Sequence, residues 1–163
     1  MARAERDGSL PAEAVISLIN EHTKLVAVTA MSNVTGFRPE LDRVIEVAHR
    51  YGAYVLVDAS QEIVHHPVSV RKSDCDFLCF SGHKIYGPMG IGVLYGKREI
   101  FEKLQPYLYG GDMVKKGDAG CICYRTDPGK YEAGTQNIAG ALGLEAAMDF
   151  LEKHSFQIGR AHV

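Results

Sequence analysis

The apolar residues of this 163-residue chain switch repeatedly between the spacing of a helix and that of a strand. Continuous apolar runs at residues 25–28 and 54–57 predict two short strands, and such runs are typical of strands that are buried on both faces. Between them, residues 41–48 carry apolar side chains at helical spacing, and Gly52 follows where a helix C-terminal cap belongs. This order favours a βαβ unit with a parallel sheet.

The alternation continues along the rest of the chain without an internal repeat or a low-complexity linker. Two more strands are predicted at residues 77–80 and 92–95, and the short connection between them is expected to reverse the strand direction. Helices are predicted at residues 11–22, 97–103 and 137–153, and a hairpin around residues 121–124. Small residues crowd the last helix, which implies close approach to a neighbour. The predicted fold class is α/β with a mostly parallel sheet.

Composition narrows the class of protein. Lys and Arg number 18 and Asp and Glu 20, a formal net charge of −2 that argues against nucleic acid as a partner. Hydrophobic residues make up 46% and charged residues 23%, as in an ordinary globular protein. No apolar run approaches the roughly 20 residues that span a bilayer, and residues 1–10 lack the apolar core of a secretory signal. We therefore expect a cytoplasmic location and no membrane partner.

The four cysteines are expected to be free thiols, because a chain without a secretory signal rarely carries a disulfide framework. They are Cys75, Cys79, Cys121 and Cys123. Their spacing matches no usual zinc pairing, and no pair of histidines stands beside them at ligand spacing. We predict no metal site. Cys121 and Cys123 are expected to share one face of the predicted hairpin.

Polar clusters follow the predicted strands, where open α/β sheets bind their ligands. They lie at residues 32–36, 58–61, 81–84 and, before the last helix, 132–135. Each cluster alone also has an ordinary structural interpretation. Asp58 suits a helix cap, Asn33 a turn, Lys84 a solvated loop and the pair His65 and His66 a surface loop.

Together the clusters supply the parts of a pyridoxal phosphate site. A lysine at one strand end can form an imine with an aldehyde, and an aspartate at a neighbouring strand end can keep a ring nitrogen protonated. Serine and histidine just before that lysine can donate to a phosphate group. Lys84, Asp58, Ser81 and His83 are the candidates for these roles.

The same residues carry a family resemblance. Residues 81–95 (SGHKIYGPMGIGVLY) resemble the cofactor-lysine segment of class V aminotransferase-like enzymes, most closely that of SufS-like cysteine desulfurases. Further signatures of the family are similar to residues 32–36 (SNVTG), 56–61 (LVDASQ), 110–113 (GGDM) and 131–138 (YEAGTQNI). The resemblance extends from Gly8 to Leu151. It implies the large domain of the aspartate aminotransferase-like fold (fold type I) and pyridoxal 5'-phosphate as the cofactor.

The resemblance implies roles around the cofactor ring. Lys84 would hold pyridoxal phosphate covalently through an imine and then transfer protons as the catalytic acid and base. Asp58 would pair with the pyridine nitrogen. Gln61 would donate to the phenolic oxygen, and Asn33 would help to hold the cofactor or the substrate.

It also implies a phosphate site and a reaction. Ser81 and His83 would bind the phosphate group, and Thr135 would reach the phosphate held by the partner subunit of a homodimer. The substrate would be L-cysteine or L-selenocysteine. L-Cysteine would become L-alanine while its sulfur passes to an enzyme cysteine as a persulfide, and a sulfur-acceptor protein would receive it for iron–sulfur cluster assembly.

Some features depart from the family pattern. Phe37 and Arg38 stand where smaller residues are usual, Ser60 where alanine is common, and Gln136 where proline is common. Family chains are more than twice as long. Their persulfide cysteine and the arginine that binds the substrate carboxylate lie in segments that match nothing here, so this chain alone is expected to be inactive.

We therefore expect residues 1–156 to be a partial cofactor-binding large domain, truncated at both ends. Residues 157–163 break the helical pattern and resemble a foreign read-through tail. Other functions stay open on the sequence alone: a selenocysteine lyase, a kynureninase or an epimerase-like relative, or a non-catalytic domain that retains the fold. A nucleotide-binding domain is disfavoured, because neither Gly-x-Gly-x-x-Gly nor a phosphate-binding Gly-Lys-Ser/Thr loop is present.

Overall fold

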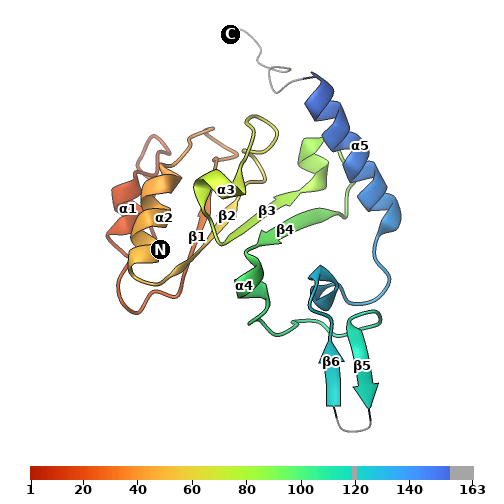
Figure 1. The fold of residues 1–163 in the computed structure, drawn as a ribbon. Coiled ribbons are helices and arrows are strands. Elements are labelled where there is room, and N and C mark those ends of the chain that lie inside the picture. Colours follow the sequence, from red (N-terminus) through yellow and green to blue (C-terminus); the bar gives the residue numbers. More distant parts are fainter. Residues whose placement is uncertain (119–120, 155–163) are drawn as a thin grey trace.

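The computed structural model describes residues 1–118 and 121–154, and a four-stranded sheet organises them (Figure 1). The strands lie in the order β1-β2-β3-β4. They are β1 (Leu25–Thr29), β2 (Tyr54–Asp58), β3 (Phe77–Ser81) and β4 (Gly92–Gly96). The first three run parallel, and β4 runs antiparallel to β3. The predicted βαβ unit and the reversal before the fourth strand are both confirmed.

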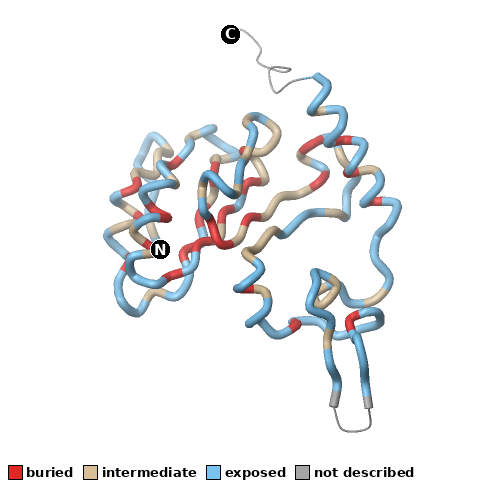
Figure 2. Tube along the Cα trace, viewed as in Figure 1, coloured by how far each residue is buried: buried red, intermediate tan, exposed pale blue. Residues whose placement is uncertain are grey.

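Helices α1 (Ala12–Ile16), α2 (Leu41–Arg50) and α3 (Val70–Ser73) lie on one side of this sheet. The buried stripe of α2, which includes Val44 and Ala48, packs in one core cluster with strand residues such as Val55. Gly52, at φ +71°, ends this helix with its amide donating to the His49 carbonyl, as the sequence predicts. Figure 2 shows that the buried residues gather where these helices meet β1, β2 and β3.

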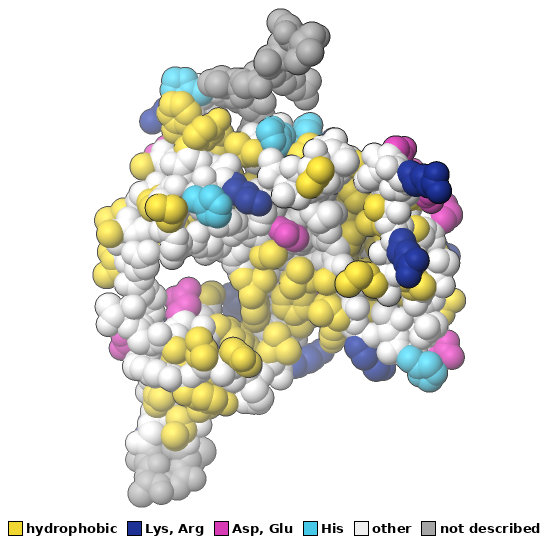
Figure 3. Space-filling view, turned by 180° about the vertical axis from the view of Figure 1, so that it is seen from behind, with side chains coloured by type: hydrophobic (Ala, Val, Ile, Leu, Met, Phe, Trp, Pro, Cys, Tyr) yellow, Lys and Arg dark blue, Asp and Glu magenta, His cyan; other side chains and the backbone are white. Residues whose placement is uncertain are grey.

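Burial of the strands on both faces is a wrong prediction for this chain. Val26, Val55 and Val57 are buried against the helices, whereas Leu25, Tyr54 and Leu94 on the other face are 51%, 41% and 55% exposed. Figure 3 looks onto that other face and shows hydrophobic side chains gathered over its middle. The apolar runs match a parallel sheet covered twice, but the helices that the structure describes cover it only once.

Apart from η1, which follows β3 at the carboxyl edge of the sheet, the remaining elements come after β4 in the chain. They are η1 (Gly82–Ile85), α4 (Arg98–Phe101), β5 (Val114–Asp118), β6 (Cys121–Tyr124), η2 (Pro128–Tyr131) and α5 (Ile138–His154). The antiparallel β5–β6 hairpin projects away from the sheet (Figure 1). Helix α5 packs on η1, and a Cβ on Gly143 would lie 2.5 Å from Pro88 Cγ. The predicted close approach of the small residues in α5 is confirmed there.

The first helix is shorter than the sequence predicts. The helix predicted at residues 11–22 ends at Ile16. The Leu18 and Ile19 amides donate to carbonyls only three residues back, and beyond them Thr23 Oγ1 accepts from the Asn20 amide and Asn20 Oδ1 from the His22 amide. The predicted tail at residues 157–163 lies outside the described residues, as does the Cys121 side chain that was expected to share a face with Cys123.

Candidate functional site

Asp58 is the last residue of β2 and stands at the carboxyl edge of the sheet. Its parallel partners are Thr29 on β1 and Cys79 on β3. The side chain is exposed, and Oδ1 accepts a hydrogen bond of 2.9 Å from the Ser60 amide. This turn keeps the carboxylate at the strand end, where a bound ligand could reach it.

Lys84 comes from the turn that follows β3. Ser81 closes the strand, and η1 carries His83 and Lys84 over the same edge. The turn is anchored by Ile85, which is 1% exposed, and by Gly82, whose amide donates to the Ile91 carbonyl at 2.9 Å. A Cβ on Gly82 would lie 2.9 Å from Ile91 Cγ2, so glycine is needed for this close packing. The lysine thus projects from a rigid turn while remaining partly accessible.

The structure brings the Asp58 and Lys84 segments to one edge of adjacent parallel strands. Side chains two apart on a strand share a face, so Asp58, its partner Cys79 and Ser81 lie on the sheet face away from α2. Ser81 Oγ and His83 Nδ1 are 2.8 Å apart and form a hydrogen-bonding pair on this side. An acid, a lysine and two groups able to donate to phosphate are therefore carried by segments at one end of the sheet.

Cys79 is a neighbour of the site that the sequence reasoning did not single out. Burial raises the pKa of the Cys79 thiol, and the negative charge of Asp58 raises it further. The thiol is therefore protonated beside the carboxylate. Strand alternation was a usable signal, because it puts residue 79 on the same face as residues 77 and 81.

Asn33 and Gln61 lie in the two loops that follow β1 and β2. The Ser32 side chain accepts from the amides of Val34 and Thr35, at 3.2 Å each, and shapes the turn that exposes Asn33. Gln61 is half-buried, with its amide nitrogen 3.4 Å from His65 Nε2. Both side chains are thus at the carboxyl edge that carries Asp58.

An ion pair between these two loops was also missed by the sequence reasoning. Two nitrogens of the Arg38 guanidinium, Nε and Nη2, each donate to one carboxylate oxygen of Glu62, whose side chain is only 7% exposed. In the sequence, Arg38 stands out only as a departure from the family pattern. Opposite charges in loops that follow adjacent strands were the available signal.

Thr135 lies apart from this cluster, in the exposed segment between η2 and α5. Figure 1 shows this segment near the β5–β6 hairpin rather than near η1. The Gly134 amide holds it by donating to the Gly111 carbonyl at 3.0 Å. The structure does not bring Thr135 to Lys84, and its role toward a partner subunit stays a prediction.

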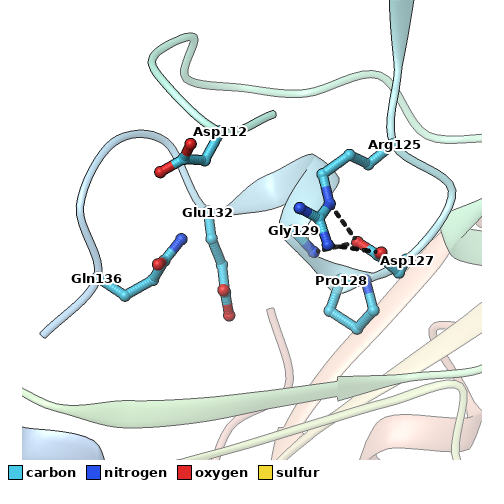
Figure 4. A pocket seen from close by; sticks show the side chains of 7 residues that line it. All are labelled: Asp112, Arg125, Asp127, Pro128, Gly129, Glu132 and Gln136. Atoms are coloured by element: carbon cyan, nitrogen blue, oxygen red, sulfur yellow. Dashed lines mark hydrogen bonds and ion pairs between the residues drawn. The ribbon is translucent and has the colours of Figure 1, made fainter. Parts of the chain in front are cut away.

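A separate hollow of about 440 Å³ opens next to Glu132 and Gln136 (Figure 4). Arg125 and Asp127 form a two-point ion pair at its rim, with N–O distances of 2.9 and 2.8 Å, and the hydrogen bond from Arg125 lowers the pKa of Asp127. Asp112, Pro128, Gly129, Glu132 and Gln136 complete the lining. None of these lining residues is a lysine, so the hollow does not offer the amine found at the sheet edge.

Within residues 1–118 and 121–154, no group of three or more His, Cys, Asp or Glu side chains could hold a metal ion. Across the same residues, no helix has the length and apolar character needed to cross a membrane.

The residues at the sheet edge fit pyridoxal phosphate by the chemistry of their donors. The cofactor needs an amine for its aldehyde, an anion for its ring nitrogen and donors for its phosphate. Lys84 offers the amine, Asp58 the anion, and the Ser81–His83 pair the donors. The open sheet face beside Asp58 leaves the carboxylate accessible.

Comparison with known proteins points to a single family. The family model described as aminotransferase class-V matches residues 1–163. The chain is 45% identical over 148 residues to a probable cysteine desulfurase of Halalkalibacterium halodurans, covering 91% of this chain and 36% of that protein. It is 48% identical over 134 residues to the cysteine desulfurase CsdA of Escherichia coli, covering 82% and 33%.

Solved structures agree with these relatives. The crystal structure of Escherichia coli CsdA matches with a TM-score of 0.84 at 45% identity and covers 89% of this chain and 36% of that one. The apo cysteine desulfurase of Thermococcus onnurineus matches with a TM-score of 0.88 at 36% identity, covering 96% and 39%. The α/β fold predicted from the sequence is confirmed. The chain spans little more than a third of the length of these relatives.

Proposed function

This chain belongs to the aminotransferase class V family, as its motifs predicted, and we propose that it is the central part of a pyridoxal-phosphate-dependent cysteine desulfurase. The observation that carries the proposal is the meeting of Asp58 and the Ser81–His83–Lys84 segment at one edge of two parallel strands. The similarity to proteins named cysteine desulfurase, at 45% and 48% identity, supports this substrate class over the other members of the family.

Each residue has a part in the proposed reaction. When bound, pyridoxal phosphate supplies an electron sink for bonds broken at the substrate α-carbon. Lys84 anchors it and afterwards holds and moves a proton at Nζ. The Asp58 carboxylate stabilises the protonated ring nitrogen. The hydrogen bond from the Ser60 amide to Oδ1 keeps the carboxylate oriented.

The remaining residues orient the group. Ser81 and His83 bind the phosphate, Gln61 donates to the phenolic oxygen, and Asn33 holds cofactor or substrate. Thr135 serves the phosphate of the partner in a homodimer. In the whole protein, L-cysteine becomes L-alanine, and its sulfur passes to an enzyme cysteine as a persulfide that a sulfur-acceptor protein takes up for iron–sulfur cluster assembly. L-Selenocysteine is the second candidate substrate, and we propose a cytoplasmic location.

The test of the proposal is an absorbance titration of the chain with pyridoxal phosphate. We expect a visible band, shifted from that of the free aldehyde, in the wild type and its loss in Lys84→Ala. Lys103→Ala removes another lysine from the same chain and should leave the band unchanged. Equal spectra for the wild type and Lys84→Ala would refute the cofactor role of Lys84.

A further inference from the structure

The ion pair of Arg38 and Glu62 joins two loops that are otherwise closed on themselves. Arg38 Nε donates to Glu62 Oε2 at 3.0 Å, and Nη2 donates to Oε1 at 2.5 Å. The side chain of Glu62 is 7% exposed and that of Arg38 is 52% exposed. A planar guanidinium that meets both oxygens of a carboxylate fixes orientation as well as distance.

The Arg38 loop carries Asn33. The Ser32 amide donates to the Phe37 carbonyl at 2.9 Å, and the Gly36 amide donates to the Ser32 carbonyl at 3.0 Å. These bonds make residues 32–37 a compact turn. Arg38 directly follows this turn, so the position of Arg38 is linked to that of Asn33.

The Glu62 loop carries Gln61. The Glu62 carbonyl accepts from the amides of His65 and His66, at 2.9 Å each, and His66 Nδ1 lies 3.5 Å from Glu62 Oε2. The Ile63 amide donates to the Ala59 carbonyl at 3.0 Å. Gln61 therefore sits inside a turn whose buried anchor is the neighbouring carboxylate.

We propose that Arg38 and Glu62 are a positioning pair that sets the separation and orientation of Asn33 and Gln61 for the group bound at the sheet edge. Neither member touches that group in this account. The inference rests on the proposed function for the identity of the bound group, pyridoxal phosphate. The link between the loops stands on the hydrogen bonds alone.

Three variants separate positioning from charge balance. Arg38→Ala alone strands a buried carboxylate and can destabilise the whole chain, so it is paired with Glu62→Ala in a double variant that removes both charges. Arg38→Lys keeps the positive charge but cannot form the two-point contact. Arg43→Ala, which breaks exposed ion pairs with Glu13 and Glu40 instead of the pair with Glu62, is the matched control.

The first measurement is amide hydrogen exchange of the full chain without cofactor. In the double variant and in Arg38→Lys, the amides of residues 32–38 and 59–66 should both exchange about tenfold faster, because the two loops are no longer held together. The β2 amides should keep their protection. Arg43→Ala should change neither loop. Unchanged exchange in both loops of the double variant would overturn the positioning role, whatever the cofactor does.

The second measurement is the dissociation constant of pyridoxal phosphate and the wavelength of its visible band. We expect both to shift in the double variant and in Arg38→Lys, with binding about fivefold weaker or more, at a thermal midpoint close to that of the wild type. If Arg38→Lys kept the wild-type affinity and spectrum, the positive charge alone would be sufficient and the two-point contact would have no positioning role, which would refute the inference. A wild type without any Lys84-dependent band would instead refute the proposed function, and the exchange data would still decide the link between the loops.

Discussion

Asp58 influences a thiol that no motif points to. Its β3 partner Cys79 has a raised pKa, first because the thiol is buried and second because the carboxylate is negative. In Asp58→Asn the second cause disappears, so the thiolate fraction at pH 8 should increase. We expect Cys79 to react with iodoacetamide about threefold faster or more, measured by peptide mass mapping. Glu46→Gln, an exposed carboxylate on α2, is the control; an unchanged rate in Asp58→Asn would mean that the two groups do not interact.

Asp76 is a buried carboxylate at the opposite, amino-terminal edge of β3. Oδ2 accepts from the Val55 amide at 2.7 Å and lies 2.9 Å from His49 Nε2, and Oδ1 lies 3.1 Å from Lys97 Nζ. Burial alone would raise the pKa of Asp76, but these contacts hold it below the ordinary value of 3.8. A carboxyl whose pKa is lowered by folding stabilises the fold above its unfolded pKa, and this stability disappears as the pH falls through the folded value.

The free energy of unfolding of the wild type should therefore decrease as the pH falls below about 4. Asp76→Asn should lose about 3–5 kcal/mol at pH 7, because Lys97 loses its buried partner, and should show less dependence on acid pH. Urea unfolding at several pH values measures both effects. Asp74→Asn, at an exposed partner of the same lysine, should cost less than about 1 kcal/mol. Equal losses in the two variants would contradict the role of burial.

The sequence predicts those residues of the candidate site that lie in short contiguous motifs. Lys84, Asp58 and Ser81 were identified from segments of a few residues each, and the structure brings them to one edge of the sheet. The pair of Arg38 and Glu62 was not, because its members are 24 positions apart and meet only when two loops fold over adjacent strands.

Helix α5 supports the turn that carries Lys84. Its Leu144 Cδ1 lies within 3.4 Å of the position that a Cβ would take on either Gly82 or Gly87, and Gly143 faces Pro88. In Gly143→Ala the new Cβ would be 2.5 Å from Pro88 Cγ, so the helix must move away from η1. The variant should lose about 1–3 kcal/mol of unfolding free energy, although alanine gains about 1 kcal/mol in helix propensity.

Thermal or urea unfolding measures this loss. Ala141→Gly, at an exposed position of the same helix, calibrates the propensity contribution and should cost about 1 kcal/mol. If Gly143→Ala were more stable than the wild type, the close packing between α5 and the Lys84 turn would be wrong.

The existence of most elements followed from periodicity, and the ends of several did not. The strands and the long helix α5 carry patterns that match their observed bounds closely. The first helix stops at Ile16, where the next amides donate three residues back and the Asn20 and His22 amides then bind side chains, so local hydrogen bonds rather than apolar spacing set this end.

The exposed face of the sheet is the largest difference between expectation and structure. Apolar runs indicated strands covered on both sides, and the helices within the described residues cover one (Figures 2 and 3). Nothing in the apolar pattern says which residues supply the second layer. The chain spans about a third of the length of its relatives, so its own elements are not the whole set that those proteins have.

We expect the chain to self-associate through this face, because large exposed apolar patches drive association in water. Leu94→Lys places a charge at its β4 edge, where the side chain is 55% exposed, and should shift the association to higher protein concentration. Leu18→Lys, at a 49% exposed position outside the sheet, should not. Sedimentation velocity over a concentration series measures the difference, and identical behaviour of both variants would show that the sheet face is not involved.

The central claim is that the amine of Lys84 binds the aldehyde of pyridoxal phosphate. The direct measurement is reduction of the mixture with sodium borohydride, which fixes a lysine imine permanently, followed by peptide mass mapping. We expect a single modified lysine, Lys84, and loss of the modification in Lys84→Ala. Modification spread over exposed lysines such as Lys103 and Lys115, with Lys84 no more labelled than they are, would contradict it.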